Sequence, residues 1–162
     1  LRRVRSAKQS PEADPQWLAD ADAIRDKFRR GVGMDAAPTT FRLLCVGGLQ
    51  QLWNADVQAF FVGELLTDKE PDVRRLAADA LGQKAKPGDL VAHAALAKLL
   101  TDDSPAVRRA AALAIGRLKA DGAADALIAA WKADENADPF LADAYLRALE
   151  RLGKPGIDAL LT

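Results

Sequence analysis

The chain has 162 residues, a formal net charge of zero and only 6% aromatic residues, and alanine makes up about a fifth of it. This length suits a single domain, and the composition is typical of an all-helical protein. A balanced charge argues against sequence-independent nucleic-acid binding, which needs a basic surface. The sequence contains no apolar run that predicts a membrane span or the core of a signal peptide.

The first third of the chain predicts an irregular segment followed by two helices. Residues 1–14 lack helical periodicity, whereas Pro15 opens a helix that we expect to end near residue 30, at Gly31-Val32-Gly33. A second apolar helix is predicted from about residue 39 to residue 53. Gly48 lies 34 residues before Gly82, and 34 residues is also the period at which the rest of the chain repeats. We therefore interpret residues 15–53 as a degenerate N-terminal repeat.

The rest of the chain repeats itself. The similar stretches 68–82 and 102–116 define a 34-residue period, and each places a proline near its start and a glycine at its end. Self-similarity at such a period indicates a helical repeat array, in which stacked pairs of helices bury a continuous core. We predict repeats at 55–83, 89–118 and 123–153, because Pro139 again follows Pro105 by one period. Residues 154–162 are predicted to be a truncated final segment.

Residues 68–82 and 102–116 resemble the HEAT repeat, in the short alanine-rich form also called the PBS-lyase HEAT-like repeat. The resemblance implies a right-handed α-solenoid of about four helical pairs. It also implies that the arginine after each valine, Arg74 or Arg108, pairs with a turn aspartate of a neighbouring repeat. A ladder of Arg and Asp at one period can cross-link repeats, so we expect the following residues to stack repeats and not to bind a ligand: Asp68, Arg74, Asp102 and Arg108.

The resemblance also implies that the second helix of each pair lines a concave face. Polar residues outside the apolar stripe of these helices would then face a partner, and their charge changes from basic to mixed along the array. These candidate partner-binding residues are Arg75, Asp79, Arg109, Asp143 and Arg147. The alternative is that they form an ordinary solvated face.

The residue types that carry catalysis or bind metals are sparse. Cys45 is the only cysteine and lies in an apolar segment, which favours a buried inert thiol over a nucleophile. His93 is the only histidine, so neither a metal cluster nor a catalytic triad is expected. The three tryptophans are interpreted as core residues, although an exposed one could anchor a partner; they are Trp17, Trp53 and Trp131.

We therefore expect a protein-binding or scaffolding module that uses its concave surface, without catalytic residues or a cofactor. Its partner would be another protein, or a neighbouring domain or subunit. The chain begins without Met and stops in an apolar segment, so we interpret it as part of a longer protein or assembly. The resemblance leaves two other functions open, namely bilin lyase-type chromophore attachment and nucleic-acid binding of the kind found in HEAT-like DNA-repair glycosylases. It also leaves open that the array belongs to a larger enzyme whose chemistry lies elsewhere.

Overall fold

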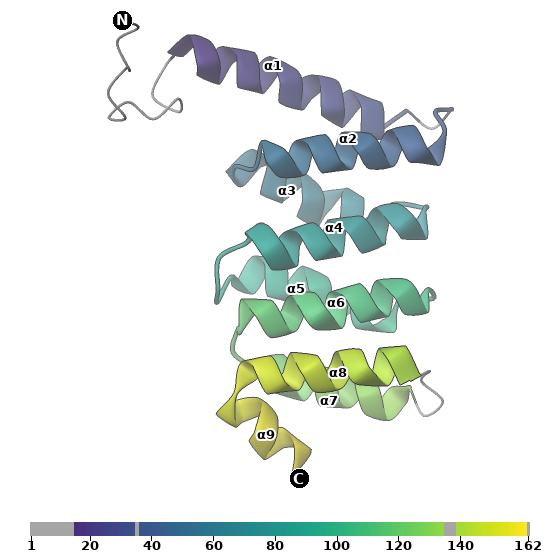
Figure 1. Ribbon diagram of the computed structural model, residues 1–162, viewed down its shortest axis with the longest axis vertical. Coiled ribbons are helices and arrows are strands. Elements are labelled where there is room, and N and C mark those ends of the chain that lie inside the picture. Colours follow the sequence, from purple (N-terminus) through teal and green to yellow (C-terminus); the bar gives the residue numbers. More distant parts are fainter. Residues whose placement is uncertain (1–14, 35, 135–138, 162) are drawn as a thin grey trace, which may run out of the picture. The chain divides into compact units, whose positions relative to one another are not determined.

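The computed structural model describes residues 15–34, 36–134 and 139–161, with side chains described from residue 21 onward. Every regular element in these ranges is helical (Figure 1). The segment 1–14 that we predicted to be irregular lies outside this description, as does the side chain of Trp17. The chain divides into two compact units, Leu1–Leu52 and Trp53–Thr162.

The first unit is a hairpin of two helices, α1 (Pro15–Val32) and α2 (Thr39–Gln51). Each helix supplies an arginine that caps the C-terminal end of the other. Arg25 Nε donates to the carbonyl of Leu52 at 3.0 Å, and Arg42 Nε donates to the carbonyl of Val32 at 2.7 Å. These bonds satisfy carbonyl groups that the ends of helices leave without partners, and they explain how both arginines are buried.

The second unit contains two layers of helices (Figure 1). One layer consists of α4 (Pro71–Lys84), α6 (Pro105–Leu118) and α8 (Pro139–Leu152). The other consists of α3 (Ala55–Gly63), α5 (Leu90–Lys98) and α7 (Ala123–Ala133). A short helix, α9 (Lys154–Leu160), follows α8.

The helices begin where local chemistry favours it. α4 and α6 each have proline as their first residue, where the missing N–H has no helical partner to lose. The side chain of Asn54 caps α3 by accepting from the N–H of Val57, and that of Asp89 caps α5 by accepting from the N–H of Ala92.

Glycine allows the helices of the first layer to pack closely. A Cβ atom on Gly82 of α4 would lie 2.6 Å from the Cα atom of Ala114 in α6. The same relation recurs one repeat later, where a Cβ on Gly116 of α6 would lie 2.6 Å from the Cα of Ala148 in α8. Since real Cβ atoms do not approach so closely, both positions require glycine for this spacing. Most of α6 is consequently buried between its neighbours.

The structure gives the ends of the helices in more detail than the sequence does. The helices α3 and α5 are each followed by a 3-10 turn, η2 (Leu65–Thr67) and η3 (Leu99–Thr101) respectively. Trp53 was predicted to end α2 but lies beyond it. Gly153 has a φ of 71° and precedes the short helix α9, which lies within the segment that we predicted to be truncated. The boundaries assigned to individual repeats stay a prediction.

Candidate functional site

Arg74 joins two successive turns of the second unit. Its Nε donates to Asp102 Oδ2 at 2.7 Å and its Nη2 donates to Asp102 Oδ1 at 2.8 Å, a bidentate pair. Its Nη1 donates to the backbone carbonyl of Asp68 at 2.9 Å. Both partners of the pair are largely buried, with side chains 12% and 7% exposed. Arg74 therefore links the turn before α4 to the turn before α6.

The carboxylate of Asp102 serves two purposes in this link. It accepts from Arg74, and its Oδ1 also accepts from the backbone N–H of Ser104 at 2.9 Å. Burial disfavours its ionised form, but the hydrogen bonds from Arg74 and Ser104 outweigh this cost and hold the pKa of Asp102 below its ordinary value. Asp68 makes the equivalent bond to the N–H of Glu70. Both aspartates therefore shape the turns that precede the prolines.

Arg108 makes the next link, but with a different partner position. Its Nη1 donates to the carbonyl of Asp102 at 2.8 Å, whereas its Nε donates to Asp134 Oδ2 at 3.1 Å. Asp134 lies two positions short of one full period after Asp102, so the repeat does not identify it. The buried hydroxyl of Tyr145 donates to the same oxygen at 2.9 Å, and burial together with this bond raises the pKa of Tyr145. The four predicted ladder residues thus lie within the packed links between repeats.

The candidate partner-binding residues lie on α4, α6 and α8. Most of them form ion pairs with residues of their own helix. Arg75 lies 3.4 Å from Asp72 and 3.8 Å from Asp79, and Arg147 lies 2.6 Å from Asp143. Such exposed pairs contribute little stability but neutralise each other's charge. Arg109 differs from the others, because it is exposed and has no ion-pair partner in the described part of the chain.

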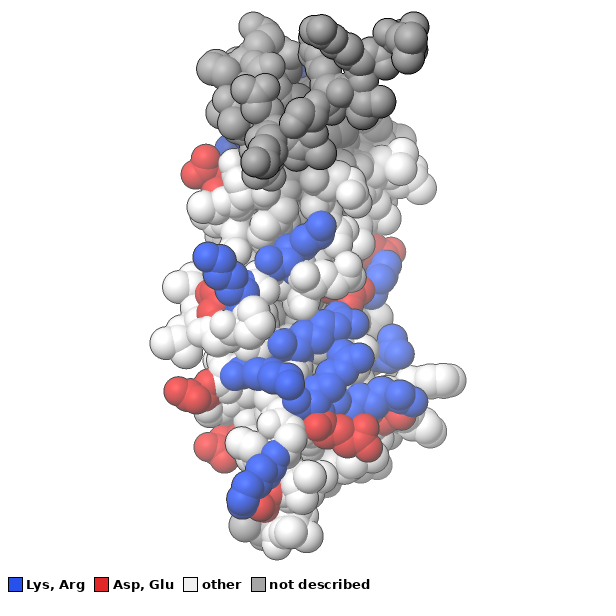
Figure 2. Space-filling view, turned by 60° about the vertical axis from the view of Figure 1, so that its left-hand side comes forward, with Lys and Arg blue, Asp and Glu red and all other residues white. Residues whose placement is uncertain are grey.

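Sequence reasoning missed a second set of basic residues at the C-terminal ends of the same layer. α4, α6 and α8 run in the same direction, so their last turns lie at one edge, and each last turn is basic: Lys84, Arg117 and Arg151. Figure 2 shows lysine and arginine side chains gathered on one face of the molecule. The signal was present in the sequence, where Arg117 and Arg151 are one period apart, but helix-dipole compensation alone can also place cations there.

Of the described tryptophans and the two single candidate residues, Trp53, Trp131 and His93 are half-buried and Cys45 is buried. Trp53 is half-buried with its ring edge-to-face to Phe61 at 5.0 Å, and Trp131 stacks on Tyr145 at 6.3 Å. Cys45 is buried, which raises the pKa of its thiol. His93 is half-buried, burial lowers its pKa, and its Nε2 atom lacks a hydrogen-bond partner in the described structure.

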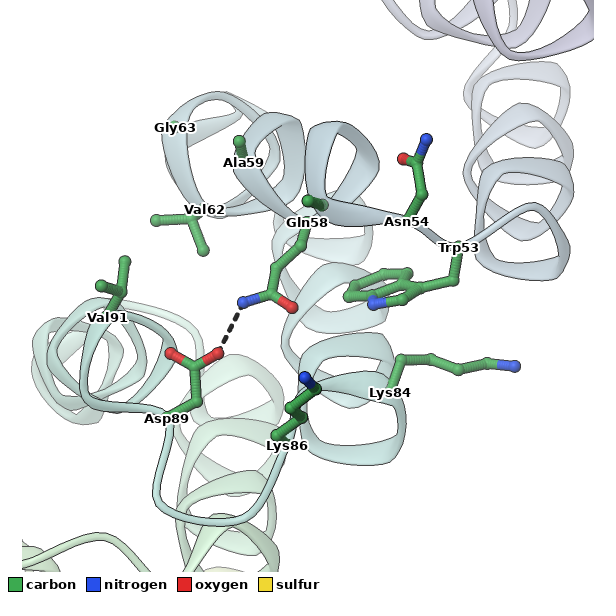
Figure 3. A pocket seen from close by; sticks show the side chains of 11 residues that line it. Trp53, Asn54, Gln58, Ala59, Val62, Gly63, Lys84, Lys86, Asp89 and Val91 are labelled. Carbon is green, nitrogen blue, oxygen red and sulfur yellow. Dashed lines mark hydrogen bonds between the residues drawn. The ribbon is translucent and has the colours of Figure 1, made fainter. Parts of the chain in front are cut away.

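A groove that the sequence did not reveal lies between α3 and α5 (Figure 3). One pocket of about 670 Å³ is lined by Trp53, Gln58, Lys84, Lys86 and Asp89, among others. A second pocket of about 470 Å³ continues from it toward η2 and η3, and the two share Val62 and Val91. The sequence analysis predicted that the second helix of each pair binds a partner, whereas this groove lies between two first helices.

Neither a metal centre nor a membrane span is found in the described residues. No group of three or more His, Cys, Asp or Glu side chains there is arranged to hold a metal ion. None of the described helices combines the length and the apolar character needed to cross a bilayer.

Comparison with known proteins agrees with the layered arrangement. A family model of HEAT repeats matches residues 59–150, which is more than half of the chain and lies within the second unit. A comparison with curated proteins finds no match. HEAT repeats generally mediate protein interactions and are typically non-catalytic. With the repeated glycine contacts and the arginine links between its turns, the chain belongs to the HEAT repeat family.

Proposed function

We propose that this chain is a docking module that binds an acidic surface of a partner protein through the α4–α6–α8 face. This face comprises the predicted positions Arg75, Asp79, Arg109, Asp143 and Arg147 together with the basic ends Lys84, Arg117, Lys119 and Arg151. The first five are those that we predicted to face a partner, and the last four extend the same surface.

The supporting observation is that some arginines of this face form ion pairs within the chain and others do not. Arg75 and Arg147 are compensated by aspartates of their own helices. Arg109 and Arg151 are exposed and have no ion-pair partner in the described structure. Cations without intramolecular partners are available to an opposing carboxylate, and they mainly increase the association rate and the specificity of binding.

The mixed charge favours a protein over a nucleic acid. Carboxylates of Asp72, Asp79, Asp143 and Glu150 interrupt the basic residues. A phosphate backbone carries a regular negative charge and would be repelled at each of these positions, whereas a protein surface can place its own cations opposite them.

The rigidity of the array supports the same proposal. The links made by Arg74 and Arg108 and the close helix contacts at Gly82 and Gly116 hold the three helices in a fixed spacing. A preorganised surface loses little conformational entropy when a partner binds.

The test uses the full chain as immobilised bait in a lysate of its source organism. An Arg109→Glu/Arg151→Glu variant reverses two exposed charges on the α4–α6–α8 face, and a Lys27→Glu/Lys132→Glu variant makes the same change in charge elsewhere. We expect a stoichiometric protein partner that the wild type and the control retain and the first variant loses. Retention by all three would contradict the site, and recovery of a bilin or a nucleic acid instead of a protein would contradict the function.

A further inference from the structure

The groove between α3 and α5 combines an apolar floor with basic ends. Its middle is formed by Val62 and Val91, which line both pockets. Trp53 lines one end, and Figure 3 shows its indole ring and the side chain of Val62 directed toward the space between the helices. The two pockets adjoin, so together they form one elongated groove.

Two apolar side chains at the start of α5 are exposed. Leu90 is 62% exposed and Val91 is 66% exposed, both in the first turn. α3 begins with an equivalent cap at Asn54, and at the second position after its cap it carries Asp56, where α5 carries Val91. An acidic residue suits the first turn of a helix better than valine does, because it interacts with the helix dipole. Leu90 and Val91 line the second pocket together with Val62, so they belong to a contiguous apolar patch, and such patches mark binding sites.

The charge of the groove is positive, although it contains one carboxylate. Both carboxylate oxygens of Asp89 accept hydrogen bonds from other residues of the chain. Oδ1 accepts from the N–H of Ala92 at 2.9 Å, and Oδ2 accepts from Gln58 Nε2 at 2.7 Å. Lys84 and Lys86 are exposed at this end, and Lys98 lies at the other. None of the three lysines forms a salt bridge in the described structure, although the charge of Lys86 contributes to the lowered pKa of Asp89. The groove therefore complements an occupant that carries carboxylates at its ends.

We propose that this groove binds a short acidic segment of a partner protein. An aromatic or branched apolar side chain of the segment would pack against Trp53, Val62 and Val91, and flanking Asp or Glu residues would lie near Lys86 at one end and Lys98 at the other. The elongated shape favours a peptide over a compact small molecule, because a peptide contacts both pockets at once. Buried apolar anchors supply most of the affinity in such sites, and the surrounding charges select the partner.

The probe is a phage-displayed library of random dodecapeptides selected against the immobilised full chain. We expect the selected peptides to combine apolar anchors with acidic residues, and to shift the NMR signal of the Trp53 indole N–H, which a Trp53→Phe variant assigns. A library that yields no binder above the empty support would overturn the proposal. So would binders that shift only residues of the α4–α6–α8 face.

Two variants of the groove test its two components, and affinities are measured by calorimetry. Val91→Asp places in α5 the residue that α3 has at the same position, so the fold is retained, and we expect at least a tenfold loss of affinity. Lys86→Glu/Lys98→Glu, which reverses one lysine at each end of the groove and leaves the α4–α6–α8 face unchanged, should cause a similar loss. Leu44→Asp changes a leucine on α2 that is 73% exposed and should leave the affinity unchanged. Unchanged binding by Val91→Asp, with wild-type thermal unfolding, would overturn the proposal.

The same peptides separate this site from the one proposed above. Arg109→Glu/Arg151→Glu alters the opposite layer and should leave peptide affinity within twofold of wild type. If that variant loses the lysate partner but still binds the peptides, both sites are supported. Failure of either site is then measured independently of the other.

Discussion

Arg74 and Arg75 are adjacent arginines with contrasting surroundings. Arg74 is 12% exposed and makes a bidentate pair with a buried aspartate, whereas Arg75 is 38% exposed and makes only long pairs within its own helix. Removing one member of a buried pair leaves the other as an uncompensated charge, whereas an exposed pair contributes little. The position of an arginine relative to the turns, and not its residue type, decides its contribution.

We expect Arg74→Met to lower the free energy of unfolding by about 2–4 kcal/mol, because Asp102 loses its partner. The matched variant Arg75→Met should lower it by less than about 0.5 kcal/mol. Urea unfolding followed by circular dichroism measures both values. Equal effects of the two substitutions would show that the link between turns does not stabilise the array.

Tyr145 and Arg108 share one acceptor oxygen on Asp134. Tyr145→Phe should cost about 1 kcal/mol, since the ring remains in place and only one hydrogen bond is lost. A double-mutant cycle with Arg108→Met should give a coupling free energy of at least about 0.5 kcal/mol, because the two bonds belong to one network. Strictly additive effects would contradict the shared site.

His93 should make the stability of the chain depend on pH. Burial lowers its pKa below 6.5, so the unfolded chain binds a proton more readily than the folded chain does. The free energy of unfolding should therefore change little between about pH 7 and pH 8 and fall as the pH drops below about 6.5, with a slope of at most about 1.4 kcal/mol per pH unit for one proton. Since His93 is the only histidine, His93→Leu should remove this slope between pH 5 and pH 7. A slope that persists in the variant would contradict the assignment.

At the scale of elements, two glycines determine how closely the helices pack. Gly82 and Gly116 each lie against the backbone of the next helix in their layer, whereas a Cβ on Gly63 of α3 would meet nothing within 4 Å. Helix propensity favours alanine at all three positions, so the sign of a substitution depends on the space available.

Gly116→Ala should lower the free energy of unfolding by about 1–3 kcal/mol, because the new methyl group overlaps the backbone of Ala148 and forces α6 and α8 apart. The control Gly63→Ala should be neutral or slightly stabilising. Thermal unfolding of the two variants makes the comparison. A stabilising Gly116→Ala substitution would show that the helices do not approach as closely as described.

Much of the helical framework was predictable from the sequence. Pro71 and Pro105 mark helix starts through local backbone chemistry, and the repeat period identifies the glycine positions. The partner of Arg108 was not predictable, because Asp134 departs from the period and its position depends on how the chain turns after α7. The groove was not predictable either, since it results from the packing of α3 and α5, which another helix separates along the chain.

At the scale of the whole molecule, burial is concentrated in the middle of the second unit. Six residues of α4 and eight of α6 are buried, whereas only Gly156 is buried in α9. Stability in a repeat array comes from each repeat and its interfaces with neighbours, so an element that buries few of its residues opens more readily.

We therefore expect the slowest backbone hydrogen exchange in α4 and α6 and much faster exchange in α9. Exchange measured by mass spectrometry on peptides from 71–84, 105–118 and 154–160 provides the test. Uniform protection across the three peptides would mean that the second unit opens only as a whole.

The contacts of α6 determine where a further repeat can be inserted into the array. Its residue Ala114 packs against Gly82 of the preceding helix α4, and its residue Gly116 packs in the same way against Ala148 of the following helix α8. A tandem duplication of segment 89–122, which is one full period, would therefore reproduce interfaces that already exist and would need no compensating substitution. In contrast, α8 carries Glu150 where α6 carries Gly116, so a copy inserted after α8 would not find the same fit. The array can be lengthened from its centre more readily than from that end.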